Sequence, residues 1–291
     1  MNDQDKLSIL LDNLRLCDAR SSRDAEQRSI MLSEIAKHLC RVSQYEDISE
    51  IIARFCELTD STKVSDGIAI CSALVSEARL LDALRYTVSV GHEESTPAGS
   101  HGKVAFTKNK YNEIAFEQLS KKIIGAKAHY TASLSDACEA VNDGECEFCI
   151  IPVRNSHDGR LWGFYSLLDR YGLKICSVCS VESIDSISST DYALVGKYSP
   201  EPSKRQSADL PLIFEFSVLS EDGEFLTDLL SVARQCRATL LYIDSRPVEY
   251  DIQSCRYILS FYLKASDSLL LRSLLETYYD SYSPIGLYQK N

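Results

Sequence analysis

The spacing of hydrophobic and polar positions changes along the chain, and three segments with different patterns follow one another. In the first segment, up to about residue 86, apolar residues such as Ile51 and Phe55 recur at the spacing of amphipathic helices. No strand pattern interrupts them. Ser, Thr and Asp cluster at 41–47 and 60–66, where helices are expected to end. This segment is therefore predicted to form three helices.

The second segment alternates between short apolar runs and helical patterns. Strands are predicted at 104–106, 128–130 and 148–153, and helices at 113–122 and 135–144 lie between them. This order favours a parallel sheet with right-handed crossovers. A helix over 161–171 and a strand over 173–181 are predicted to follow.

The third segment begins with strict alternation. Phe214, Phe216 and Val218 alternate with Glu215 and Ser217, which predicts a strand buried on one face only. A helix at about 225–233 and two strands at 240–246 and 256–264 are predicted to follow. A second helix is predicted to begin at Asp267, with Ser266 as its cap, and a last strand to cover 285–288. The order βαββαβ is that of a ferredoxin-like domain.

Two polar stretches separate these segments, GHEESTPAGSHG at 91–102 and SPEPSKRQSA at 199–208. Gly and Pro resist regular structure, and neither stretch offers an apolar face to bury. The predicted class is α+β. The predicted domains are a helical domain at 1–90, an α/β domain at 103–198 and a βαββαβ domain at 210–291. Linkers at 91–102 and 199–209 connect them.

Composition narrows the function classes. Of 291 residues, 45% are hydrophobic and 25% charged, and the net charge is −11, so the chain can bury a core but should repel nucleic acid and anionic lipid. No apolar run approaches the ~18 residues of a membrane span, and the first residues lack a signal pattern. We expect a cytoplasmic protein that binds neither nucleic acid nor membrane. Eleven scattered cysteines are expected to be reduced thiols.

Two further patterns suggest chemistry but have simpler explanations. The pairs Cys146 with Cys149 and Cys176 with Cys179 have zinc-like spacing, yet both pairs lie on or against predicted strands, where positions three apart face opposite sides. Buried thiols are the favoured interpretation, and neither a metal nor a cofactor is expected. The run 155–158, Asn-Ser-His-Asp, is interpreted as a hinge and turn, because residues adjacent in sequence rarely meet in the geometry of a catalytic triad.

A family resemblance is clearest near the C-terminus. The run 243–247, Ile-Asp-Ser-Arg-Pro, follows the predicted helix, Gly223 precedes it, and Ile-Gly-Leu-Tyr closes the chain at 285–288. This resembles the ACT regulatory domain of prephenate dehydratases, whose hallmark is Glu-Ser-Arg-Pro. The resemblance implies an amino-acid effector site at Gly223, Asp244, Ser245, Arg246 and Pro247. It also implies a homodimer formed through sheet edges. The family's Gly-Ala-Leu corresponds to Gly-Glu-Phe at 223–225, so only the glycine is kept. Alternatively, Pro247 ends the strand and Arg246 pairs with an acidic neighbour.

The middle segment resembles the dehydratase domain of the same family, which has two lobes like a periplasmic binding protein. Ile-Pro-Val-Arg-Asn-Ser at 151–156 is similar to the family's Val-Pro-Ile-Glu-Asn-Ser hinge, and Thr-Asp-Tyr at 190–192 to its Thr-Arg-Phe signature. The glycine-rich turn after the first strand corresponds to 107–110, which has no glycine. Only 160–189 separates hinge from signature, which predicts a truncated domain without the second lobe.

The N-terminal helices resemble the chorismate mutase domain that is fused to dehydratases in the bifunctional P-protein. The similarity rests on position, helix number and the register of 28–37 and 76–84. A mutase clamps a dianion with several cations. Arg28 matches one of them and Lys37 lies near another, while the first-helix arginine is replaced by Leu11.

Together these resemblances imply candidate catalytic residues at Thr190, Asn155, Ser156, Arg28 and Lys37. Thr190 could protonate a leaving hydroxyl, but Asp191 replaces the family's arginine. A close charge pair contributes about 4 kcal/mol. Replacing an attractive arginine by a repulsive aspartate therefore changes the free energy of binding a carboxylate by roughly twice that. Alternatively, Thr190 is merely a strand residue. We therefore expect a prephenate dehydratase and chorismate mutase relative of phenylalanine biosynthesis with eroded catalytic sites. The alternative is a non-catalytic regulatory protein that senses an amino acid. The ligand would be prephenate, chorismate or a phenylalanine-like molecule.

Overall fold

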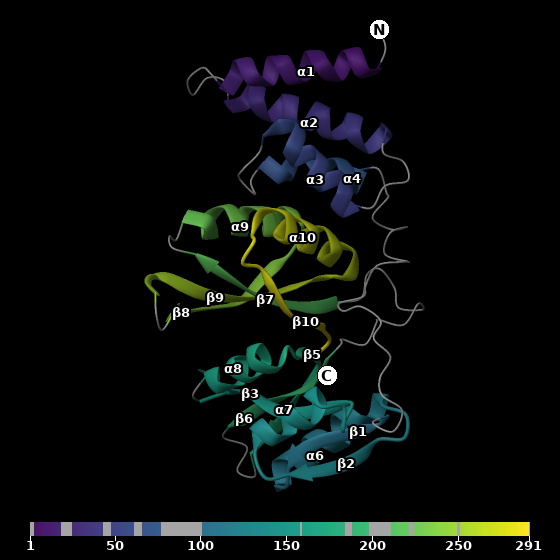
Figure 1. The fold of residues 1–291 in the computed structure, drawn as a ribbon, viewed down its shortest axis with the longest axis vertical. Coiled ribbons are helices and arrows are strands. Elements are labelled where there is room, and N and C mark those ends of the chain that lie inside the picture. Colours follow the sequence, from purple (N-terminus) through teal and green to yellow (C-terminus); the bar gives the residue numbers. More distant parts are fainter. Residues whose placement is uncertain are drawn as a thin grey trace. The chain divides into compact units, whose positions relative to one another are not determined.

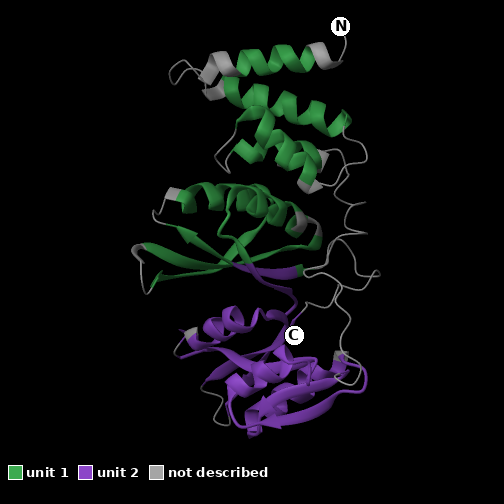
Figure 2. Ribbon diagram, viewed as in Figure 1, with its two compact units in different colours: residues 1–88, 204–211, 217–283 green, residues 89–203, 212–216, 284–291 purple. Residues whose placement is uncertain are grey.

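The structure is a computed structural model of the whole chain. The residues that it describes are 3–18, 25–42, 48–60, 66–76, 101–157, 159–183, 188–197, 211–220, 224–248 and 251–290. Gly223, Leu81, Leu84 and most of the two predicted linkers therefore lie outside the described residues. Two compact units make up the chain, the first from 1–88, 204–211 and 217–283 and the second from 89–203, 212–216 and 284–291 (Figure 2). The predicted division into three domains stays a prediction.

The N-terminal part of the first unit is helical. Its described helices are α1 (Asp3–Asp18), α2 (Ala25–Val42), α3 (Ile48–Thr59) and α4 (Gly67–Ser76) (Figure 1). The prediction of three helices is wrong, because the polar run Ala-Arg-Ser-Ser-Arg-Asp at 19–24 separates α1 from α2. Ser and Asp favour helix ends over helix interiors. The predicted apolar positions Ile51, Phe55 and Leu74 are fully buried.

The C-terminal part of the chain adds two helices, two strands and part of a third strand to this unit. The helices are α9 (Glu224–Gln235) and α10 (Ala265–Tyr278). The strands, in sheet order, are β7 (Pro211–Ser220), β9 (Asp251–Lys264) and β8 (Thr239–Val248). Residues 212–216 of β7 belong to the second unit. Helix α10 begins at Ala265 with Lys264 as its N-cap, so the predicted cap Ser266 is wrong. Helix α10 contacts α3, and Tyr278 accepts a bond from Cys56 across 3.1 Å.

The second unit is built around a mixed sheet. Its strands are β1 (Lys103–Thr107), β2 (Lys127–Thr131), β3 (Phe148–Asn155), β4 (Gly159–Arg160), β5 (Lys174–Glu182), β6 (Ser189–Gly196) and β10 (Ser283–Tyr288). Their order is β2-β1-β3-β6-β5-β10, with β4 paired to β3. As the alternation predicted, β1 pairs in parallel with both β2 and β3. Strand β6 is antiparallel to β3 and β5.

Three α-helices pack on this sheet, α6 (Lys110–Leu119), α7 (Leu134–Asn142) and α8 (Trp162–Tyr171), and a short 3₁₀ turn, η3 (Ser120–Lys122), follows α6. One face of the sheet packs on α6 through a core that includes Phe106, Leu119, Ile150 and Tyr192. Helices α7 and α8 contact each other. In the stretch 160–189, the described residues form the end of β4, then α8 and β5. Strand β5 joins the same sheet, and no second sheet forms among the described residues of this stretch.

Strand β7 differs from its prediction. Glu215 is 2% exposed and Ser217 is 5% exposed, although their alternation with phenylalanines predicted a solvent face. Other parts of the second unit cover Glu215, as described below.

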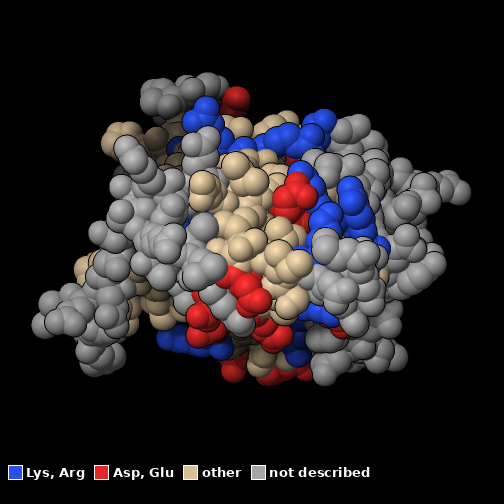
Figure 3. Space-filling view, turned by 90° about the horizontal axis from the view of Figure 1, so that it is seen from above, with Lys and Arg blue, Asp and Glu red and all other residues tan. Residues whose placement is uncertain are grey.

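Two surface observations bear on the expected partners. None of the helices in the described ranges is long and apolar enough to cross a membrane. On the face seen in Figure 3, basic side chains alternate with acidic and uncharged ones, so the described residues there form no continuous basic surface. That nucleic acid is not a partner stays a prediction.

Candidate functional site

The structure brings two predicted residues of the dehydratase-like segment together. Asn155 at the end of β3 pairs in register with Thr190 at the start of β6. The Asn155 Nδ2 donates to Thr190 Oγ1 across 3.1 Å, and Asn155 Oδ1 accepts the backbone N–H of His157 across 2.8 Å. Thr190 Oγ1 is the acceptor in this bond, so the bond does not use the proton of the Thr190 hydroxyl.

Ser156 has a structural role beside this pair. Its Oγ accepts the backbone N–H of Ser189 across 2.9 Å, and its own N–H donates to the Ser189 carbonyl across 2.8 Å. These bonds fasten the turn after β3 to the start of β6. The interpretation of this run as a hinge and turn fits these contacts, although Asp158 lies outside the described residues.

Asn155 and Thr190 project beyond the end of β1, on the face covered by α6. Ala105 pairs with Cys149, so Thr107 at the end of β1 is level with Ile151, and β3 continues for four more residues. Side chains alternate along a strand, so Thr190 shares a face with Tyr192. Tyr192 packs in the core with α6, and burial raises its pKa, with a further contribution from Tyr111 in the first turn of α6. Thr190 therefore overhangs the N-terminus of α6.

The first turn of α6 lies on the same face of the sheet as Thr190 and carries the positive end of a helix. Asn109 caps the helix by accepting the Asn112 N–H across 2.8 Å, and the buried Asn112 side chain donates to the Thr107 carbonyl and hydroxyl, each across 2.7 Å. These bonds fix the turn that the family resemblance aligns with a glycine-rich loop. The exposed Lys108 lies 5.1 Å from the Tyr130 ring centroid, and Lys110 begins the helix. A helix N-terminus with adjacent cations favours anions.

Strand order also points to this place. The connection after β1 leads to β2 on one side, whereas β3 lies on the other side of β1. In open α/β sheets, ligands bind outside the carboxyl ends of the two strands where the connections diverge in this way. The candidate site therefore consists of Asn155, Thr190 and the first turn of α6, which Lys110 begins; Lys108 lies over Tyr130 of β2, on the other side of β1 from β3, and is not part of it. We call this group the carboxyl-edge site.

Asp191 lies outside the carboxyl-edge site. It follows Thr190 in the strand, so its side chain projects from the opposite face. It pairs in register with Ser180, whose hydroxyl donates to Asp191 Oδ1 across 2.5 Å, and Lys290 Nζ donates to Oδ2 across 2.9 Å. The expectation that Asp191 places an uncompensated negative charge beside Thr190 is not supported by this geometry. Lys290 neutralises the carboxylate, and sequence reasoning missed it because 99 positions separate the two residues.

The two candidate mutase residues each bind a carboxylate of their own unit. Arg28 donates two bonds to Asp66, across 2.6 and 3.1 Å, and the half-exposed Lys37 donates to Glu34 across 2.9 Å. Both cations are therefore engaged with protein carboxylates rather than presented together. Their catalytic role stays a prediction.

The candidate effector residues 244–247 lie on β8, which is the last strand in its sheet order. Ser245, Arg246 and Pro247 are exposed and Asp244 is half-buried. Pro247 lies within the strand, which continues to Val248. A role for these residues in binding an effector stays a prediction.

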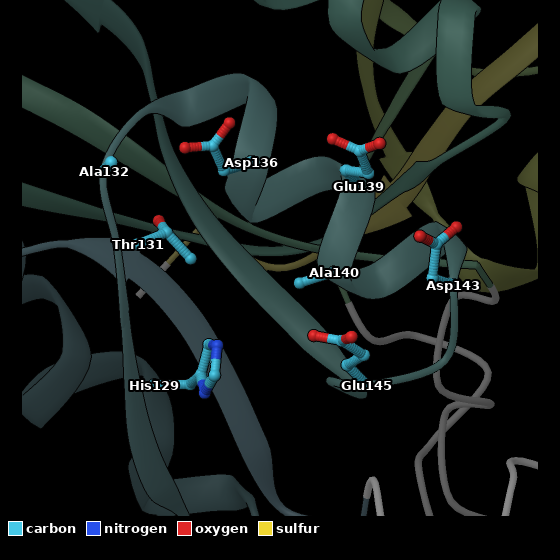
Figure 4. A pocket seen from close by; sticks show the side chains of 8 residues that line it. All are labelled: His129, Thr131, Ala132, Asp136, Glu139, Ala140, Asp143 and Glu145. Atoms are coloured by element: carbon cyan, nitrogen blue, oxygen red, sulfur yellow. The ribbon is translucent and has the colours of Figure 1, made fainter.

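A pocket of about 350 Å³ lies elsewhere in the second unit, between β2 and α7 (Figure 4). Its lining carries four carboxylates and one imidazole, from Asp136, Glu139, Asp143, Glu145 and His129. Asp136 also completes the capping box of α7 with Ser133. So many carboxylates would repel an acidic ligand, and this pocket is therefore distinct from the carboxyl-edge site.

The two cysteine pairs are buried, as predicted. Cys146, Cys149, Cys176 and Cys179 are each at most 7% exposed. Burial raises the pKa of the Cys176 thiol to about 12 and that of Cys179 to about 11. Such thiols stay protonated at neutral pH, which disfavours nucleophilic chemistry.

Comparison with solved structures identifies the class of fold, which is that of the prephenate dehydratases. The prephenate dehydratase from Streptococcus mutans has a TM-score of 0.52 and 17% identity, covering 65% of this chain and 98% of its own. The enzyme from Arthrobacter aurescens, in complex with L-Phe, has a TM-score of 0.51 and 13% identity, covering 64% and 89%. GqqA, described as a novel type of quorum quenching acylase, has a TM-score of 0.53 and 16% identity, covering 65% and 95%.

These identities establish a shared fold and no more. No protein-family model matches the chain, and no curated protein does either.

Proposed function

We propose that this chain is a prephenate dehydratase-like enzyme that acts at the carboxyl-edge site. The single observation that supports this most is the bond from Asn155 to Thr190, in which a side-chain amide holds a hydroxyl oxygen at the carboxyl end of β3. The fold shared with prephenate dehydratases is a second support. The substrate class is a small dicarboxylic acid such as prephenate.

The proposed reaction removes a hydroxyl group and carbon dioxide from prephenate and leaves phenylpyruvate. Thr190 donates its proton to the departing hydroxyl, while Asn155 holds Thr190 Oγ1 and stabilises the charge that develops there. Lys110 and the first turn of α6 hold the carboxylate that the product keeps. The electron pair of the bond to the departing carboxylate completes the aromatic ring as the bond to the hydroxyl breaks. The hydroxyl leaves as water with the Thr190 proton, and Thr190 regains a proton from solvent, so no cofactor is required.

The proposed enzyme is slow. The described residues of 160–189 form no second lobe, so the carboxyl-edge site has one wall and stays open to water. Excluding water strengthens every electrostatic interaction in a site, and an open site forgoes that gain.

The test measures phenylpyruvate formation from prephenate by the purified full chain. We expect turnover above the rate in buffer, and a loss of about 100-fold or more in kcat for Thr190→Val, because a positioned general acid contributes roughly 10²–10⁴-fold. The matched control is Thr131→Val, the same change at the end of β2, which should leave kcat unchanged. Turnover no faster than buffer would refute the proposal.

A second candidate function is regulatory. The order of elements from β7 to β10 is βαββαβ, and the strand order β7-β9-β8 in the first unit matches that expected of a ferredoxin-like domain. This supports binding of a phenylalanine-like effector by residues 244–247. A rise in melting temperature with phenylalanine but not with alanine is the expected result, because a ligand that binds only the native state stabilises it.

The same region supports a homodimer. Strand β8 presents four apolar side chains that are 36–42% exposed, at Leu240, Leu241, Tyr242 and Ile243. An exposed apolar edge strand is a template for pairing with another chain. A second copy that pairs with β8 is the proposed occupant.

A further inference from the structure

A buried carboxylate lies at the centre of a polar network in the second unit. Glu215 Oε1 accepts the Tyr165 hydroxyl across 2.5 Å and Arg160 Nη1 across 3.1 Å, and Oε2 accepts the Tyr288 hydroxyl across 2.8 Å. The Arg160 Nη1 also donates to Tyr165 Oη across 3.0 Å. The side chains of Arg160 and Glu215 are only 8% and 3% exposed. Three donors therefore satisfy a charge that water hardly reaches.

Burying this network costs free energy, because a carboxylate and a guanidinium must both lose their water. Replacing a buried ion pair of this kind with an apolar cluster of the same size is often neutral or stabilising. A contact of this kind therefore suggests a role beyond stability, such as fixing one arrangement of the elements that it joins.

The elements joined by the network lead to the carboxyl-edge site. Arg160 belongs to β4, which forms a tight hairpin with the end of β3. Within this hairpin Gly159 pairs with Asn155 and Arg160 pairs with Arg154, and the next residue, Leu161, donates its N–H to the Val153 carbonyl across 2.9 Å. Asn155, which holds Thr190, is thus one register pair away from a side chain anchored by Glu215.

We propose that Glu215 is a positioning residue: through Arg160 it holds the β3–β4 hairpin, and with it the Asn155 amide, against Thr190. Tyr165 and Tyr288 keep the carboxylate in place by donating to both of its oxygens. The pKa of Tyr288 is raised far above its ordinary range, first by burial and then by the charge of Glu215, so this hydroxyl remains a donor. The last step, that Asn155 serves catalysis, rests on the proposed function; the link from Glu215 to the hairpin does not.

The test is amide hydrogen exchange of the full chain, with Glu215→Gln as the main variant. This change keeps the shape of the side chain and removes its charge. We expect the amides of His157 and Leu161 to exchange at least 10-fold faster than in the wild type, while those of β1 stay unchanged. The matched control is Glu147→Gln, the same chemical change in the same unit, at a carboxylate whose Oε2 accepts the Gly102 N–H across 2.7 Å just before the start of β3, at the opposite end of that strand from the hairpin.

Two further variants separate positioning from general stability. Arg160→Met removes the other end of the link, and we expect the same increase in hairpin exchange. In the double variant the increase should be no larger than in either single variant, because both act through one contact. If Glu215→Gln does not fold, Arg160→Met provides the measurement alone. Hairpin exchange that is unchanged, or that rises equally in Glu147→Gln, would overturn the proposal.

Activity gives an additional readout. Where prephenate is turned over, Glu215→Gln should lower kcat by about 10-fold with little change in KM, because positioning of Asn155 acts on the proton transfer, while the first turn of α6 still binds the substrate. A full chain without any turnover would refute the proposed function, while the exchange experiment would still decide the role of Glu215.

Discussion

Gly286 on β10 allows a close approach of two strands that no other residue would permit. It pairs in parallel with Ile175 of β5, and a Cβ atom at this glycine would lie 2.8 Å from both the Ile175 Cβ and the Ile175 carbonyl oxygen. Real Cβ contacts are not that short, and a backbone oxygen in a sheet cannot turn away. Gly286→Ala must therefore push β10 and β5 apart.

The expected loss follows from overpacking, which costs typically 1–3 kcal/mol. Because two atoms clash and one belongs to the backbone, we expect about 3 kcal/mol, equivalent to a fall of roughly 10 °C in melting temperature. The assay is urea unfolding, in which the midpoint should fall while the slope stays constant.

The control makes the same chemical change in open space. Gly163 lies in α8, is exposed, and a Cβ there would meet no atom within 4 Å. Gly163→Ala should raise the free energy of unfolding by about 0.5–1 kcal/mol, because alanine loses less backbone entropy in a helix. If Gly286→Ala were as stable as the wild type, or if both changes shifted the midpoint in the same direction, the reasoning would fail.

Three further predictions concern charge, assembly and pH. Asp191→Asn should leave the turnover of prephenate unchanged within about twofold, since Asp191 faces away from Thr190; a large rise in kcat/KM would place it in the site after all. Leu241→Asp on β8 should convert a dimer to a monomer in sedimentation, because a charge at a paired edge opposes association, and a wild-type monomer would refute the interface. The buried Cys176 thiol, with its pKa raised to about 12, ionises first in the unfolded chain, near pH 8.5. The unfolded state then binds fewer protons, so stability falls from about pH 8.5 upward, by roughly 2 kcal/mol at pH 10; Cys176→Ala should show a shallower loss in urea midpoints.

Local patterns predicted most of the elements after residue 103. The strands near 104–106, 128–130 and 148–153 and the helices between them form as expected, because their apolar spacing matches the surfaces that they bury. Asn155 and Thr190 were predicted as candidate residues from two separate motifs. Their contact could not be derived from spacing, since it depends on the register of β3 against β6.

Other features depend on partners that are distant in sequence. Glu215 alternates with phenylalanines and is typical of a solvent face, yet Arg160, Tyr165 and Tyr288 make it part of the interior. The sequence predicts that the charge of Asp191 repels a substrate carboxylate, yet Lys290 pairs with it. In both cases the charge of the side chain is evident from the sequence, whereas its partners are known only from the folded chain.

The pairing of β5 with β10 also affects how this polypeptide is made. Strand β5 ends at Glu182 and β10 begins at Ser283, so roughly a hundred further residues must be translated before the second edge of β5 can pair. At ribosomal speeds of about 5–20 residues per second, that edge stays open for on the order of 5–20 s. During this interval a nascent chain exposes one edge of a mixed sheet, and holding chaperones would protect it best at this stage of synthesis.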